Sequence, residues 1–160
     1  MICRVNGAAR AGGLGLVAAA DIAIASERAT FAFSEVRIGV VPAVISVPCL
    51  RRMPSRAAAE YFLTGEVFDA NRAAEIGLLT RAVPAEDLDG ETDRYAQMLL
   101  RGAPIALAAT KDVLRDGPAH SFADGLAAMS ELSARFFGSD EAREGMAAFA
   151  AKREASWLLQ

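Results

Sequence analysis

Two glycines and one glutamate are the residues whose types and spacing could do chemistry. Gly12 and Gly13 follow a β-rich segment, residues 2–7, and directly precede an apolar, alanine-rich stretch, residues 14–20, which we expect to form a short buried helix. Neither glycine has a Cβ, so a ligand can approach this backbone closely and φ can be positive. Because the first N–H groups of a helix lack intrahelical partners, the turn could hold a developing oxyanion. The alternative is a packing turn between strand and helix.

The glutamate follows two predicted strands, residues 21–25 and 29–33. Glu35 lies in a turn, residues 34–39, that leads to Pro42. A carboxylate placed beside an oxyanion site could act as a general base and then as a general acid. For a glutamate taken in isolation, the alternative is an exposed loop residue with no role in chemistry.

This run resembles the enoyl-CoA hydratase/isomerase (crotonase) family. The motifs that carry the resemblance are Val5-Asn6-Gly7, Gly12-Gly13, Asp21, Phe31 to Glu35 and Gly39 to Pro42, with gapless spacing, and later Leu63-Thr64-Gly65, residues 74–78, residues 144–149 and Lys152-Arg153. The resemblance covers the whole chain but only the later part of a family member. It implies that on the order of a hundred residues of the family's single domain are absent before Met1.

The resemblance implies an α/β fold. Residues 1–83 would hold the later turns of the crotonase-like spiral of ββα units, and residues 84–160 a C-terminal helical region for trimerisation and for covering the acyl pocket. The residue pattern itself predicts a helix that begins at Pro42 and has Arg51-Arg52 near its end, and a second helix that begins at Pro54. It also predicts a short strand or extended connector over residues 78–83, and helices ending the chain. The expected helices are residues 57–63, 70–76 capped by Asp69, 85–101, 104–115, 122–137, and 140–152 capped by Ser139.

Site roles also follow from the resemblance. The N–H of Gly12 would donate to the thioester oxygen, with a second donor from an earlier loop outside this chain, and Glu35 would move the proton. Gly13 would bind substrate. Phe149 and Lys152 match positions that can reach a neighbouring subunit's ligand site, and a buried aromatic and a solvated lysine are the alternatives.

Arg10 stands where the family usually has a small or apolar residue. Its guanidinium could bind a carboxylate on a dicarboxylic acyl group, which we count as a substrate-binding role, or it could be a surface arginine. The run resembles the methylglutaconyl-CoA hydratase branch most.

One departure from the family's hydratase pattern bears on the reaction. The pattern has a second glutamate three residues after Gly12, and this chain has Gly15 there. A single carboxylate fits hydration of an enoyl-CoA, our first interpretation, and also isomerisation of its double bond. An interpretation of another class is a truncated, non-catalytic remnant that acts only in subunit association or acyl-CoA binding.

Composition sets the broad class. The chain has 160 residues, 53% of them hydrophobic and 23% charged, with a net charge of −3. This composition is typical of a globular domain. The basic residues form no patch that would bind nucleic acid, and no apolar stretch is long enough to cross a membrane. Cys3 and Cys49 have no metal-ligand spacing, and His120 is expected to be structural or solvent-facing. We therefore expect a cytoplasmic homo-oligomer, trimer or hexamer, with no metal and no cofactor other than the coenzyme A of an acyl-CoA substrate.

Overall fold

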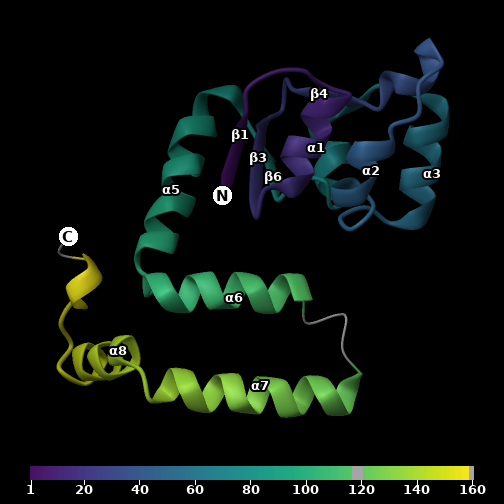
Figure 1. The fold of residues 1–160 in the computed structure, drawn as a ribbon. Helices are drawn as coiled ribbons and strands as arrows, with labels where there is room; N and C mark the ends of the chain where they lie inside the picture. The colour runs from purple at the N-terminus through teal and green to yellow at the C-terminus, as the bar shows by residue number, and fades with distance from the viewer. Residues whose placement is uncertain (117–120, 159–160) are drawn as a thin grey trace. The chain divides into compact units, whose positions relative to one another are not determined.

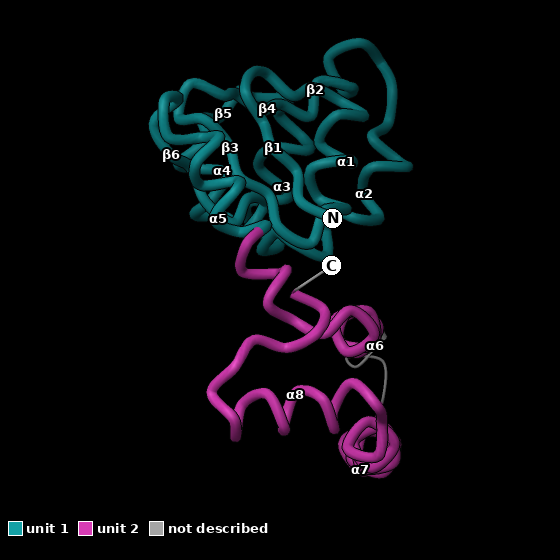
Figure 2. Tube along the Cα trace, turned by 90° about the vertical axis from the view of Figure 1, so that its left-hand side faces the viewer, with its two compact units in different colours: residues 1–96 teal, residues 97–160 magenta. Residues whose placement is uncertain are grey.

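Short strands and the helices that connect them make up the first part of the chain (Figure 1). The computed structural model describes residues 1–116 and 121–158. They divide into two compact units, residues 1–96 and 97–160 (Figure 2). In chain order the first unit contains β1 (Ile2–Val5), β2 (Ala9–Arg10), α1 (Gly12–Ala19), β3 (Ile22–Ser26), β4 (Thr30–Ala32), the 3₁₀ helix η1 (Ser34–Ile38), α2 (Ala43–Cys49), α3 (Ser55–Thr64), β5 (Phe68–Asp69), α4 (Ala70–Glu75), β6 (Arg81–Val83), the 3₁₀ helix η2 (Ala85–Asp87) and most of α5 (Leu88–Leu100).

The first sheet is parallel and has the strand order β1-β3-β6. β1 pairs with β3 in a register that places Ile2 opposite Ile22. Side chains alternate along β3, so that Ala23 and Ala25 join the larger core and Ile24 joins the small core with Leu88 of α5. Among the described strands β1 has β3 as its one neighbour, so the other edge of β1 is unpaired.

The second sheet was not predicted as such. β2 pairs in parallel with β4, where Ala9 lies opposite Phe31, and β4 pairs antiparallel with β5, where Phe31 lies opposite Phe68. β4 falls within the expected strand 29–33, but β2 and β5 have two residues each. Two residues carry no alternation that a sequence pattern could detect, so their extended conformation follows from tertiary pairing alone.

Two helix ends are formed by the residues that the sequence predicts for them. The Asp69 side chain accepts a hydrogen bond from the N–H of Arg72 at 2.7 Å and so caps α4. Gly65 ends α3 in the left-handed conformation, with φ of 62°. The helix expected from Pro42 is shorter than predicted, since α2 ends at Cys49.

Aromatic rings form the centre of the larger core. Phe31 and Phe33 are fully buried, and Phe68 stacks against both of them. Phe33 also stacks on Phe62 of α3, with ring centroids 4.1 Å apart. α1 covers this core with its buried Leu14, as expected for the apolar stretch. The sheet and helix that carry the predicted site residues are therefore anchored in one tightly packed cluster.

The second unit is helical. It contains the end of α5, then α6 (Pro104–Asp116), α7 (Phe122–Phe137), α8 (Asp140–Ala150) and the 3₁₀ helix η4 (Ser156–Leu158). Ser139 caps α8 by accepting a hydrogen bond from the N–H of Ala142, as predicted. Of its described residues Ala148 and Ala155 alone are buried. The boundary expected from the sequence, between residues 83 and 84, coincides with the end of β6, and the two units separate later, within α5.

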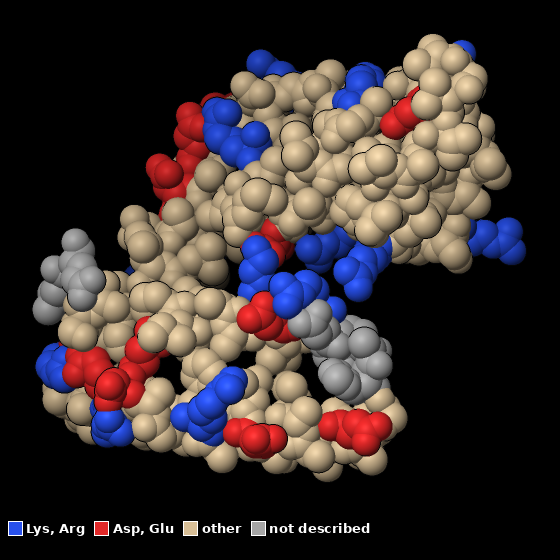
Figure 3. Space-filling view, in the orientation of Figure 1, with Lys and Arg blue, Asp and Glu red and all other residues tan. Residues whose placement is uncertain are grey.

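Charges of both signs lie on the face of the molecule drawn in Figure 3, and the area over α2 and α3 is mostly uncharged. Several exposed apolar side chains belong to α2 and to the segment before it: Ile38, Val41, Val44 and Val47. No helix in the described part of the chain combines the length and the apolarity that a bilayer-spanning segment needs. His120 lies outside the described residues.

Candidate active site

The N-terminus of α1 is built on a strained residue, Ala11. Its φ of 46° and ψ of −122° lie in a region that favours glycine. The Ala11 carbonyl accepts a hydrogen bond from the N–H of Leu14 at 2.9 Å. Because the C=O and N–H of a trans peptide point in opposite directions, the N–H of Gly12 points back from the helix N-terminus. The positive φ that the sequence allowed at Gly12 or Gly13 therefore occurs one residue earlier.

Gly12 and Gly13 begin the helix with unused donors. Among the described residues neither N–H has an acceptor. A Cβ added to Gly12 would meet no atom within 4 Å, whereas one added to Gly13 would lie 3.7 Å from the Cβ of Ala9. Gly12 is exposed, and its amide lies at the positive end of an eight-residue helix. This is the geometry that an oxyanion donor requires on the protein side.

Glu35 is buried, in contrast to the exposed loop residue that was the alternative. Its exposed fraction is 9%, and its Oε2 atom has no hydrogen-bond partner among the described residues. It lies in the first turn of η1, which ends at Gly39 in the left-handed conformation with φ of 75°. A buried carboxylate oxygen without a partner is costly, so a protein retains one where a ligand or water uses it.

Cys49 connects the Glu35 carboxylate to the contact between α1 and α2. Burial, and then the negative charge of Glu35, raise the pKa of the Cys49 thiol to about 12. The same thiol lies 3.7 Å from the carbonyl oxygen of Leu14 in α1, to which it donates. Cys49 therefore contacts α1, the helix that begins with Gly12.

Gly15 marks the position of the second glutamate in the hydratase pattern, and the helix packing leaves it no room for a side chain. A Cβ there would lie 2.9 Å from Cγ2 and 3.4 Å from Cβ of Ile45 in α2. Ile45 is β-branched and buried, so its rotamer cannot easily move aside. The close approach of α1 and α2 thus depends on a glycine at this position.

Arg10 is exposed and bound to the neighbouring strand. Its guanidinium donates to the carbonyl oxygen of Thr30 at 2.6 Å and to its hydroxyl oxygen at 2.9 Å, and also to the carbonyl oxygen of Ala9. The side chain is therefore held along the surface of the second sheet, two residues before Gly12. Its role toward a substrate carboxylate stays a prediction.

Phe149 and Lys152 belong to the second unit. Phe149 is 87% exposed, so the alternative of a buried aromatic is wrong. Lys152 is also exposed and has a positive φ of 50° just after α8. Their predicted part in ligand binding stays a prediction.

Sequence reasoning missed two residues of this region, Ala11 and Cys49. Ala11 has an ordinary residue type, and its unusual backbone conformation is visible only in the structure. Cys49 lies far from Glu35 in the chain and has no motif spacing to it. A glycine cluster that contains one alanine at a helix start is the signal that could have drawn attention to Ala11.

The arrangement defines a class of site. A free helix N-terminal amide can stabilise negative charge on a carbonyl oxygen, and a buried, unpaired carboxylate in the same unit can transfer a proton. Among the described residues, no three acidic, cysteine or histidine side chains converge as a metal site would need. That Gly12 and Glu35 act together in one site stays a prediction.

Comparisons with known proteins extend this result. The sequence profile of the family described as "Enoyl-CoA hydratase/isomerase" matches residues 1–160. The chain superimposes on a crotonase-fold structure from Legionella pneumophila with a TM-score of 0.92 and 40% identity, covering 98% of this chain and 61% of that one. For an enoyl-CoA hydratase from Shewanella pealeana the TM-score is 0.88 and the identity 41%, covering 94% and 57%.

A curated relative, the carnitinyl-CoA dehydratase of Proteus mirabilis, is 33% identical in an alignment of 164 positions. The alignment covers 98% of this chain and 62% of the relative. The chain belongs to the enoyl-CoA hydratase/isomerase family and has the crotonase fold. It spans between 57% and 62% of the length of these three relatives.

Proposed function

We propose that the protein acts as an enoyl-CoA hydratase, which adds water across the double bond of an enoyl-CoA thioester. The buried carboxylate of Glu35, which has no hydrogen-bond partner among the described residues, is the observation that carries the proposal. Family membership supports a coenzyme A thioester as the substrate. The step needs no cofactor beyond the coenzyme A that the substrate brings.

The proposed reaction uses two groups of this chain. Glu35 accepts a proton from water while the water oxygen bonds to the β-carbon of the enoyl group. The electrons of the double bond move to the thioester oxygen, where the N–H of Gly12 stabilises the enolate. The protonated Glu35 then returns a proton to the α-carbon, and the product is a 3-hydroxyacyl-CoA. Substrate contacts of Gly13, Arg10, Phe149 and Lys152 are part of the proposal.

The first prediction tests this reaction. Purified protein with crotonyl-CoA should lower the ultraviolet absorbance of the conjugated thioester, and Glu35→Gln should lower the rate by about 10²–10⁴-fold, the range for general acid–base catalysis. Glu27→Gln is the matched control, because Glu27 is an exposed glutamate of the same unit. Equal turnover by Glu35→Gln and Glu27→Gln would remove Glu35 from the mechanism.

Double-bond isomerisation is the second candidate, and the packing at Gly15 favours it. With Ile45 filling the space of a second carboxylate, Glu35 is left as the one acid–base group of the pattern. One carboxylate can carry a proton between two carbons of the same acyl chain. A 3-enoyl-CoA would then gain conjugated absorbance with this protein, whereas crotonyl-CoA would not lose it.

A non-catalytic role in association or acyl-CoA binding is the third candidate. The exposed apolar side chains of the second unit, such as Phe122 and Leu126, favour a role in association. A folded sample that binds crotonyl-CoA by calorimetry but changes the absorbance of neither substrate would support this role.

A further inference from the structure

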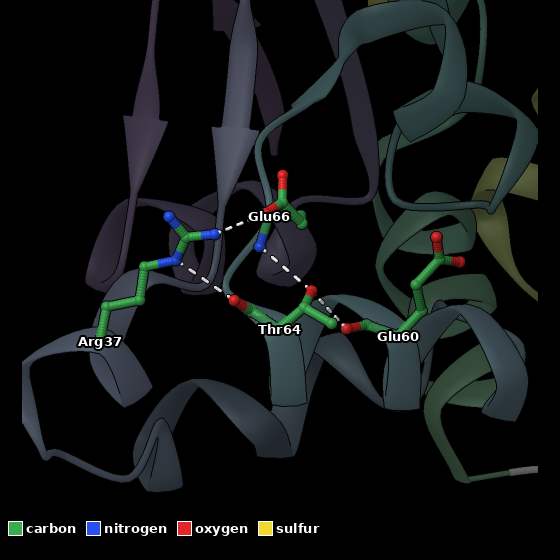
Figure 4. A network of polar contacts seen from close by, with 4 residues as sticks. All are labelled: Arg37, Glu60, Thr64 and Glu66. Carbon is green, nitrogen blue, oxygen red and sulfur yellow. Dashed lines mark hydrogen bonds and ion pairs between the residues drawn. The ribbon is translucent and has the colours of Figure 1, made fainter.

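Arg37, two residues after Glu35, connects η1 to the end of α3 (Figure 4). Its Nε donates to the carbonyl oxygen of Thr64 at 3.2 Å, and its Nη2 donates to Oε1 of Glu66 at 2.6 Å. The two bonds arise from different nitrogens of one planar guanidinium, so together they fix its orientation as well as its position. The turn that carries Glu35 is thereby tied to a segment far away in the sequence.

The acceptors of Arg37 are themselves held in place. The Thr64 hydroxyl donates to the carbonyl oxygen of Glu60 at 2.7 Å and accepts from the N–H of Glu66 at 3.1 Å (Figure 4). Gly65 lies against the guanidinium, since an added Cβ would be 3.0 Å from Nε of Arg37. The close approach is possible because glycine has no Cβ. Arg37 therefore contacts a corner of the chain, formed by Thr64, Gly65 and Glu66, whose own hydrogen bonds hold it in place.

The other end of η1 is also anchored. Phe33, which directly precedes η1, is fully buried and stacks on Phe62 of α3. Just after η1, the N–H of Val40 donates a hydrogen bond to the carbonyl oxygen of Glu35 at 3.0 Å. Glu35 thus lies between a buried aromatic anchor on its N-terminal side and the Arg37 bridge on its C-terminal side.

We propose that Arg37 is a positioning residue for the Glu35 carboxylate. It acts by holding η1 against the corner formed by Thr64, Gly65 and Glu66. The Arg37 side chain is 53% exposed, and an exposed ion pair contributes little to global stability. Its effect should therefore appear in the geometry of the turn rather than in the unfolding midpoint. The inference rests on the proposed function, in which Glu35 moves the proton.

The second prediction concerns turnover. In the full chain, Arg37→Ala should lower kcat by about 10- to 100-fold, because a base displaced by about an ångström loses its alignment with substrate. KM should change by less than about twofold, since the substrate contacts remain. Arg37→Lys should recover part of kcat, because a lysine can reach Glu66 but cannot make both bonds. A change in KM alone, or full kcat in Arg37→Ala, would overturn the inference.

A second measurement does not depend on turnover. Hydrogen–deuterium exchange in the peptide covering residues 34–40 should be faster in Arg37→Ala than in wild type. Arg81→Ala is the matched control: Arg81 is also 53% exposed and ion-paired, 3.2 Å from Glu91, but lies on β6. Equal exchange of this peptide in both variants would overturn the inference even if kcat fell. If wild type turns over neither enoyl-CoA, the proposed function fails, and exchange alone still decides whether Arg37 holds the turn.

Discussion

Ala11 has the most strained backbone of the candidate site. Its ψ orients the peptide that joins it to Gly12, so the unusual conformation sets the direction of the Gly12 N–H. A non-glycine residue in such a region costs about 1–3 kcal/mol, which the packing of α1 must offset. Strain at the position that orients the proposed donor fits a site whose geometry matters more than its local stability.

The third prediction follows from that strain. Ala11→Gly should stabilise the protein by about 1 kcal/mol, the relief of strain less the extra conformational entropy of glycine in the unfolded chain. The midpoint of urea unfolding, followed by circular dichroism, should rise with an unchanged slope. Ala19→Gly, within the same helix where φ is ordinary, should instead destabilise by about 0.5–1 kcal/mol. A lowered midpoint in Ala11→Gly would show that Ala11 is not strained.

At the scale of single residues, the sequence predicted the polar groups of the candidate site but not the side chains that surround them. The helix start predicted the unused amide of Gly12, and the family resemblance singled out Glu35, whose burial the sequence did not predict. The contact between Gly15 and Ile45 could not be predicted, because it depends on how closely two helices approach. The Arg37 bridge could not be predicted either, since its partners lie almost thirty residues away.

Among the elements, helices were predicted better than strands, for a local reason. A cap such as Asp69 or a terminator such as Gly65 acts within one turn of its own helix, so the sequence nearby contains the signal. β2 and β5 exist because Ala9 and Phe68 both pair with Phe31, a contact between distant segments. Such pairing leaves no local pattern.

An ion pair between Arg153 and Glu144 holds the segment after α8 against that helix, and its strength depends on pH. Two nitrogens of Arg153 bind the two carboxylate oxygens of Glu144, at 2.7 and 2.8 Å, and the N–H of Ser156 donates to the same carboxylate. These bonds, with that to Arg153 first, lower the pKa of Glu144 to about 2. Trp157, the one tryptophan of the chain, follows directly and donates to the carbonyl oxygen of Arg101.

The fourth prediction is the pH range in which the ion pair between Glu144 and Arg153 is lost. Because the folded-state pKa of Glu144 is lowered from 4.5 to about 2, its stabilisation is complete above pH 4.5 and disappears as the pH falls toward 2. Trp157 emission should shift toward that of a solvent-exposed indole over this range. Glu144→Gln should show the shifted emission already at pH 7, while Glu86→Gln, an exposed control, should behave as wild type. Identical curves for Glu144→Gln and wild type would refute the assignment.

On the scale of the whole molecule, the described residues of the second unit form no hydrophobic core of their own. Its described helices are amphipathic, yet large apolar side chains remain exposed, such as Phe122 at 88% and Leu126 at 60% on α7. Sixteen residues of helix without one buried side chain cannot account for their own stability in water. Further apolar contacts are needed, and a homo-oligomer, trimer or hexamer, is the arrangement that we expect to supply them.

The fifth prediction tests that arrangement. Light scattering after gel filtration should give a mass that is a multiple of three chains. Each large apolar side chain buried at an interface contributes about 1.5–3 kcal/mol, so Phe122→Ser with Leu126→Ser should raise the dissociation constant by more than about 100-fold. Glu131→Gln, at an exposed position of the same helix, should leave the mass unchanged. If wild type is a folded monomer at micromolar concentration, these faces do not associate, and the helices must be stabilised within one chain.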